Sequence, residues 1–197
     1  MDSAEKEGHH KAACPERGKG LISSNYTIAK WLVKEKDLDK LLAIPSAKKE
    51  IIKETPYKYS IRVAYQTPVA IDYDGTVKEA IASTFEDCLV YTNYQLFKGI
   101  STDDTGSLVK SVSDAINSAS SFEDFHKGVY EILRSGKSDQ KAEFALDLIY
   151  AIDPIGIPPE VMICIVRTLP FPTDLIIVPD YIDEGLEWLQ SYLDPEE

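Results

Sequence analysis

PVAIDYDGTVKEA, residues 68–80, is the stretch on which the fold of this chain depends. It holds a short apolar run, two aspartates and the Asp-Gly pair that tight turns favour. Thr76 and Glu79 have the spacing of a capping box, in which two side chains and two backbone N–H groups bond reciprocally at a helix start. Beyond them, apolar residues recur every three or four positions until Gly99. The stretch therefore predicts a turn followed by one continuous helix from Val77 to Lys98.

Helical periodicity extends over most of the remaining chain. Asn25, Asp37, Ser121 and Asp180 are good N-cap residues that each precede apolar residues at helical spacing. Ser46 precedes a further short helix, AKKEIIKE, and another helix is expected near residues 139–152. EVMICIVRTL, residues 160–169, is so uniformly apolar that a buried strand fits it nearly as well as a helix, and LIIVP, residues 175–179, fits a short strand or a buried connector, so helix and strand both stay open for residues 160–179.

One region alternates with the period of two that is typical of a strand. Residues 59–65 alternate apolar and polar side chains, and VAIDY, residues 69–73, is a second short candidate strand. The sequence thus predicts a mainly α protein, a helical bundle with a small β-hairpin or strand pair near residues 57–74. It further predicts a flexible N-terminal tail over 1–22, a small basic helical/β module over 23–75 and an acidic helical domain over 76–197.

Charge divides the chain into two electrically different parts. The 197 residues carry a net charge of −12. Residues 1–62 hold 13 basic against 9 acidic side chains, a difference of +4, whereas residues 63–197 hold 8 against 24, a difference of −16. Such asymmetry indicates an anionic partner for residues 1–62, which we call the basic front, or attraction between the two ends of neighbouring copies. The acidic part repels nucleic acid and anionic lipid, so only the first third is a candidate to bind either.

The expected location is cytoplasmic or otherwise intracellular. No apolar run approaches the roughly 18 to 20 residues of a membrane span, and the N-terminus lacks the apolar core of a signal peptide. The three cysteines are far apart, which argues against a disulfide framework and a zinc site. His9, His10 and Cys14 could ligate a soft metal, but the cost of ordering a tail favours solvated side chains there. We expect no cofactor, and we expect His126 to rim the core.

Three segments carry a resemblance to a known enzyme family. VAIDYDGTV (69–77), LVYTN (89–93) and LIIVPDYIDE (175–184) resemble the first, second and fourth motifs of the haloacid-dehalogenase-like phosphohydrolases. The resemblance implies a catalytic Asp72 nucleophile, an Asp74 acid and base, and Mg²⁺ bound by these two with Asp180. Against it, only twenty residues separate Asp72 from Thr92, which is short for a crossover plus the family's flap insertion. The helical pattern through Thr92 favours the turn instead.

The order of elements over residues 25–74 also resembles a winged-helix module. Three short helices precede an alternating strand, and a third helix would present Lys48, Lys49 and Lys53 to a nucleic-acid backbone, with Arg62 nearby. Arg62 is the one arginine of that segment, so little in it could read base edges.

The preferred function is non-catalytic. The chain is interpreted as an interaction, assembly or regulatory protein, a candidate self-associating structural component with a basic front and an acidic helical body. Its partner is another protein, a second copy of the chain, or both. Eleven tyrosines and two tryptophans provide amphipathic contact area, and Trp31 and Trp188 are the candidate interface anchors.

Overall fold

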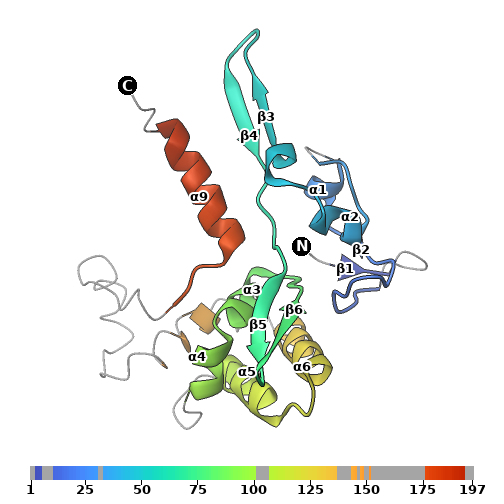
Figure 1. Ribbon diagram of the computed structural model, residues 1–197, viewed down its shortest axis with the longest axis vertical. Coiled ribbons are helices and arrows are strands. Elements are labelled where there is room, and N and C mark those ends of the chain that lie inside the picture. The colour runs from blue at the N-terminus through green and yellow to red at the C-terminus, as the bar shows by residue number, and fades with distance from the viewer. Residues whose placement is uncertain are drawn as a thin grey trace. The chain divides into compact units, whose positions relative to one another are not determined.

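The architecture is mixed α/β. The computed structural model shown in Figure 1 describes residues 3–5, 11–30, 33–100, 107–136, 143–145, 147–148, 151 and 176–193. These residues contain helices together with three separate two-stranded sheets. The predicted helical bundle is therefore wrong. The helix expected near 139–152 lies largely outside the described residues, and the undecided segment 160–179 lies mostly outside them.

The chain divides into two compact units. The first unit contains Met1–Ala70, Glu79–Cys88 and Val178–Glu197, and the second contains Ile71–Lys78 and Leu89–Ile177. The domain boundaries predicted at residues 22 and 75 stay a prediction.

The deciding stretch forms a β-hairpin. Strands β5 (Val69–Tyr73) and β6 (Thr76–Ala80) make one of the two-stranded sheets. Asp74 and Gly75 join them with φ values of 50° and 78°, the two positive φ values of a type I′ turn, for which Asp-Gly is a preferred sequence. The expected turn is confirmed. The expected capping box and the helix start at Val77 are wrong, because these residues continue into a strand.

The helix begins eight residues later with a different cap. Helix α3 (Phe85–Thr92) follows Thr84, whose hydroxyl and backbone N–H both donate to Asp87 Oδ1, at 2.8 Å and 2.5 Å. The backbone N–H of Ser83 donates to Asp87 Oδ2 at 2.8 Å. Helix α3 ends at Thr92, and α4 (Tyr94–Gly99) follows after Asn93, so the predicted continuous helix is two helices.

The first unit has a small core built around two short helices. Helices α1 (Tyr26–Lys30) and α2 (Leu38–Leu42) begin at the predicted caps Asn25 and Asp37, whose carboxamide and carboxylate oxygens accept backbone N–H groups. Strand β1 (Ser3–Ala4) pairs antiparallel with β2 (Ile22–Ser23). The core comprises six buried residues, Leu21, Ile28, Leu38, Leu41, Val63 and Tyr65.

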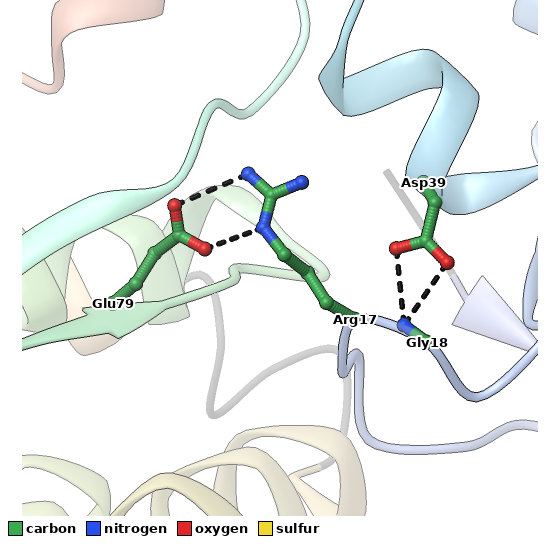
Figure 2. A network of polar contacts seen from close by, with 4 residues as sticks. All are labelled: Arg17, Gly18, Asp39 and Glu79. Carbon is green, nitrogen blue, oxygen red and sulfur yellow. Dashed lines mark hydrogen bonds and ion pairs between the residues drawn. The ribbon is translucent and has the colours of Figure 1, made fainter.

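Two polar contacts fasten the loop that precedes this core. Figure 2 shows Arg17 donating to both carboxylate oxygens of Glu79, at 2.5 Å and 3.1 Å. The next backbone N–H, that of Gly18, donates to both oxygens of Asp39 at 3.2 Å and 3.0 Å. Gly18 has φ 71°, a conformation that a glycine adopts without strain. The two contacts, each of two hydrogen bonds, hold the loop to α2 and to the end of β6.

A two-stranded ribbon replaces the predicted third helix. Residues Ser46–Lys49 form a single 3₁₀ turn, η1, and Glu50–Lys53 form strand β3. Strand β3 pairs antiparallel with β4 (Tyr59–Arg62), and Ile51 lies opposite Ile61. Cross-strand pairs of β-branched residues stabilise a ribbon, which explains why EIIK is not helical here. The strand predicted within residues 59–65 is confirmed for its first part.

The second unit has an aromatic core. Helices α5 (Ser107–Ser118) and α6 (Phe122–Ser135) pack together, and α6 begins at the predicted cap Ser121, whose Oγ accepts from Asp124 N–H at 3.0 Å. Rings from the β5 end, α3, α4 and α6 contact one another with centroids 5.1–5.8 Å apart; they are Tyr73, Tyr91, Tyr94, Phe122 and Phe125.

Candidate protein-interaction site

Helix α9 (Asp180–Leu193) lies alongside the β3–β4 ribbon, within the first unit (Figure 1). The closest polar contact is between Arg62 at the end of β4 and Glu184 in the first half of α9. Ser46 of η1 bonds to both: its hydroxyl donates to Glu184, and Arg62 Nη2 donates to Ser46 Oγ at 2.6 Å. Three segments of the sequence thus meet at one ionic cluster.

Arg62 is the most deeply placed charge of this cluster. Its side chain is 7% exposed, whereas that of Glu184 is 36% exposed. The Ser46 hydrogen bond and the charges of Arg62 and Lys49 hold the pKa of Glu184 below its usual value. Because a buried charge without a partner is costly, the Arg62 guanidinium favours the docked position of α9.

Lys49 lies beside the cluster with 5% of its surface exposed. Its Nζ atom is 4.5 Å from the centroid of the Tyr65 ring. Burial lowers the pKa of Lys49, and the Glu184 carboxylate partly opposes that shift. The cation therefore relies on the face of an aromatic ring and on the same carboxylate that pairs with Arg62.

A second set of contacts lies further along α9. The Tyr192 hydroxyl donates to Glu50 Oε1 of β3 at 2.8 Å, and the Tyr192 ring lies 5.0 Å from that of Trp188. A side chain at Gly185 would place its Cβ 3.4 Å from Ala64 Cβ, so the helix backbone comes close to the chain after β4. Glu184, Gly185, Trp188 and Tyr192 lie on one face of α9, which we call the inner face.

A second apolar face of α9 remains uncovered. Ile182, Leu186, Leu189 and Leu193 follow one another at spacings of four, three and four residues, which places them in one row along the helix. The three leucines are 56%, 46% and 70% exposed. None of the α9 residues, all of which the structure describes, is buried. We call these four residues the leucine stripe.

One face of the ribbon bonds to α9 and the other does not, and Ile52 on the bonded face is itself 52% exposed. Glu50 and Arg62 lie opposite each other in the register and both bond to α9, so their side chains share the face towards that helix. Ile51 pairs with Ile61 and Lys53 pairs with Tyr59, and these four point to the other side. On this outer ribbon face, as we call it, Ile51 is 37% and Tyr59 47% exposed.

The candidate nucleic-acid contacts are separated by the fold. Lys48 and Lys53 are exposed, whereas Lys49 and the Arg62 side chain are buried, Arg62 in its pair with Glu184 and Lys49 beside that pair. The third helix that was expected to present the lysines is wrong, because η1 and β3 occupy its place. Arg62 therefore pairs with the chain's own Glu184, and Lys49 lies over the ring of Tyr65.

The candidate catalytic aspartates serve the hairpin turn. Asp72 Oδ1 accepts the N–H of Gly75 at 3.0 Å, and Asp74 Oδ1 lies 3.7 Å from Lys98 Nζ with 73% of its side chain exposed. Thr92 is the last residue of helix α3, so the segment LVYTN lies at the end of a helix and is not a strand. Asp180 is the exposed first residue of α9. In the part of the chain that is described, no three His, Cys, Asp or Glu side chains are grouped to hold a metal ion.

The remaining candidates have different outcomes. Trp31, His9 and His10 lie outside the described residues, and Cys14 is half-buried. Trp188 belongs to the inner face of α9, as described above. His126 is buried, stacks on Phe122 with centroids 6.1 Å apart, and receives the Tyr91 hydroxyl on its carbonyl oxygen at 3.2 Å.

Sequence reasoning missed Glu184, Ser46 and the leucine stripe as parts of one site. The charge asymmetry predicts attraction between neighbouring copies, not an ion pair within one chain. The sequence carries no signal that pairs Arg62 with one particular carboxylate among 24 acidic residues after position 62. The four-three-four spacing in α9 was readable as an apolar row, but its exposure depends on tertiary packing.

Across the described ranges, no helix combines the length and apolarity that crossing a membrane requires. Comparison of the chain with protein-family models, with curated protein sequences and with solved structures finds no match.

Proposed function

We propose that this chain is a non-catalytic, intracellular interaction and assembly protein that associates with further copies of itself. The observation that carries the proposal is the leucine stripe of α9, three of whose four residues are about half exposed or more. A row of large apolar side chains in contact with water is a typical sign of a protein-interaction surface.

A second feature supports the same function. The outer ribbon face adds Ile51 and Tyr59 to the exposed apolar side chains of the first unit, and Tyr57 near the end of the ribbon is 79% exposed. Exposed aromatic and aliphatic residues on a two-stranded ribbon suit protein contact, since an isolated ribbon is marginally stable without cover.

The proposal is tested by sedimentation velocity of the full chain over a hundredfold concentration range at low and at high salt. We expect species larger than the monomer that dissociate on dilution, and weaker association at high salt because opposite charges contribute to the contact. A chain that stays monomeric at the highest concentration in both buffers would contradict self-association.

A further inference from the structure

We infer that the leucine stripe of one copy docks on the outer ribbon face of a second copy. This inference rests on the proposed function and adds the two surfaces that meet. It also implies a reciprocal contact, because a two-fold arrangement places the second copy's α9 on the first copy's ribbon.

A chain cannot make this contact with its own helix. The chain's own α9 lies on the opposite face of the ribbon, where it bonds to Glu50 and Arg62. The leucine stripe is centred roughly a third of a turn around the helix from the inner face, given 3.6 residues per turn. The three leucines of the stripe, and Ile51 and Tyr59 of the outer ribbon face, are therefore left exposed after the chain has folded, whereas Ile182 and Ile61 are half-buried.

The two surfaces have similar lengths. From Ile182 to Leu193 the stripe spans about 16 Å at 1.5 Å per residue. The four-residue strands β3 and β4 span about 13 Å at 3.3 Å per residue. A single helix laid along the ribbon would thus cover Ile51, Ile61 and Tyr59 with little of the stripe left over.

The charges of the two surfaces indicate that α9 of a second copy binds the outer ribbon face. Helix α9 carries four acidic residues, Asp180, Asp183, Glu184 and Glu187, and no basic residue. Residues 46–62 carry five basic residues against two acidic ones, a difference of +3, and Lys53 and Lys58 are exposed. Pairing α9 with a second α9, or ribbon with ribbon, would bring like charges together. Docking α9 of one copy on the ribbon of the other, which we call the crossed contact, brings opposite charges together.

The chain already makes a contact of this chemistry internally. Glu184 pairs with Arg62, and Tyr192 bonds to Glu50, where the inner face of α9 meets the ribbon. The crossed contact repeats that pairing on the ribbon's other side, with Asp183 and Glu187 available to Lys53 and Lys58. None of these four residues belongs to the internal cluster around Arg62.

Two charge-reversal variants of the full chain test the inference. The helix variant is Asp183→Lys with Glu187→Lys, and the ribbon variant is Lys53→Glu with Lys58→Glu. Each alone sets like charges against each other across the contact, so we expect the dissociation constant of self-association to rise about tenfold, which corresponds to about 1.4 kcal/mol. In an equimolar mixture the two variants can pair with each other, and both contacts of that pair again join opposite charges. We expect the affinity of this mixed pair to return to the wild-type value.

Controls of equal charge separate position from net charge. Asp114→Lys with Glu131→Lys matches the helix variant, and Lys110→Glu with Lys127→Glu matches the ribbon variant, both on exposed positions of α5 and α6. These controls should associate much as the wild type does, apart from the general effect of net charge. Circular dichroism verifies that all four variants are folded.

The outcomes distinguish the inference from the proposed function. A wild-type chain that stays monomeric would contradict both the proposed self-association and the crossed contact. A wild type that associates, with a ribbon variant indistinguishable from its control, would end the crossed contact and leave self-association standing. Weakening by both variants, with recovery in the mixture, is the result that supports the crossed contact.

Discussion

Arg62 and Glu184 lie 122 positions apart in the sequence and form an ion pair in which the arginine side chain is 7% exposed. The pair joins the basic front of the chain to its acidic C-terminal helix inside one unit. The attraction predicted from the charge asymmetry is between neighbouring copies and stays a prediction, whereas this ion pair lies within a single chain. Together with the hydrogen bond between Tyr192 and Glu50, this pair joins α9 to the ribbon.

Acidification should therefore release α9. The folded-state pKa of Glu184 lies below its ordinary 4.5, so its contribution to stability is present above pH 4.5 and is lost as the pH falls through the lower folded value. With a carboxylate 36% exposed, we expect the contribution to be about 1 kcal/mol or less. Fluorescence of Trp188 in a Trp31→Phe background would follow the release.

Glu184→Gln and Glu187→Gln are a matched pair for this prediction. The first removes the partner of a buried guanidinium and should lower the free energy of unfolding at neutral pH and flatten its acid dependence. The second changes an exposed residue outside the Arg62 cluster and, at a protein concentration low enough to keep the chain monomeric, should leave both unchanged. Equal acid profiles for the two variants would show that the Arg62 pair does not hold the helix.

Removal of the Asp87 carboxylate should destabilise the start of α3. The Asp87 oxygens accept the backbone N–H groups of Ser83 and Thr84, and the side chain is buried at 1% exposure. Asp87→Ala removes the acceptor of the buried Ser83 N–H and of the half-buried Thr84 N–H, and we expect a loss of about 1–3 kcal/mol in urea unfolding. Asp87→Asn keeps one oxygen and should lose less, and Glu86→Ala on the same turn should lose little.

This cap shows what could be predicted from the sequence and what could not. Thr76-x-x-Glu79 and Thr84-x-x-Asp87 both have capping-box spacing, and the apolar residues after either one recur at helical intervals. Local pattern alone gave no reason to prefer the second. The Asp-Gly turn decides between them, because its two positive φ values return the chain as a hairpin and extend Thr76 as a strand.

Short segments with long-range partners account for the other differences. Asn25, Asp37, Ser121 and Asp180 mark helix starts because their signal is local. The segment Glu50–Lys53 has a composition that fits a helix, and only its pairing with β4, whose strand pattern was visible, makes it a strand. The contacts between α9 and the ribbon were not predictable, because they join residues more than 100 positions apart.

The hairpin turn should be sensitive to a side chain at Gly75. Its φ of 78° is strained for any residue with a Cβ, while no heavy atom lies within 4 Å of the position a Cβ would take. Gly75→Ala therefore tests the strain of the backbone without a clash of the added side chain. We expect a loss of about 1–2 kcal/mol in the free energy of unfolding, measured by heat or urea. Gly99→Ala is the control, since that position is equally open and has no positive φ.

Asp72→Ala tests the role of the candidate nucleophile in the same turn. The Asp72 carboxylate accepts the Gly75 N–H at an exposed position, so we expect a loss of about 0.5–1.5 kcal/mol in stability. Asp72→Asn retains an acceptor oxygen and should recover most of that loss. A stability equal to wild type in the alanine variant would contradict a structural role of this bond.

Tyr65 links the ribbon to the core of the first unit. Its phenol should lose its proton at a higher pH than an exposed tyrosine does. The hydroxyl donates to the Leu41 carbonyl oxygen at 2.8 Å, and burial raises the pKa of Tyr65 to about 12. Since the unfolded phenol titrates near its ordinary 10.0, the free energy of unfolding should fall as the pH rises between 10 and 12. Urea unfolding across this range measures the slope.

Tyr65→Phe separates the hydrogen bond from the ring. It should lower the free energy of unfolding at neutral pH by about 1 kcal/mol, because the Leu41 oxygen keeps a second donor, the Ile44 N–H at 3.2 Å. It should also reduce the alkaline slope. Tyr181→Phe is the comparison, since burial likewise raises the pKa of Tyr181 to about 12. If the double variant kept the full wild-type slope, neither phenol would be the titrating group.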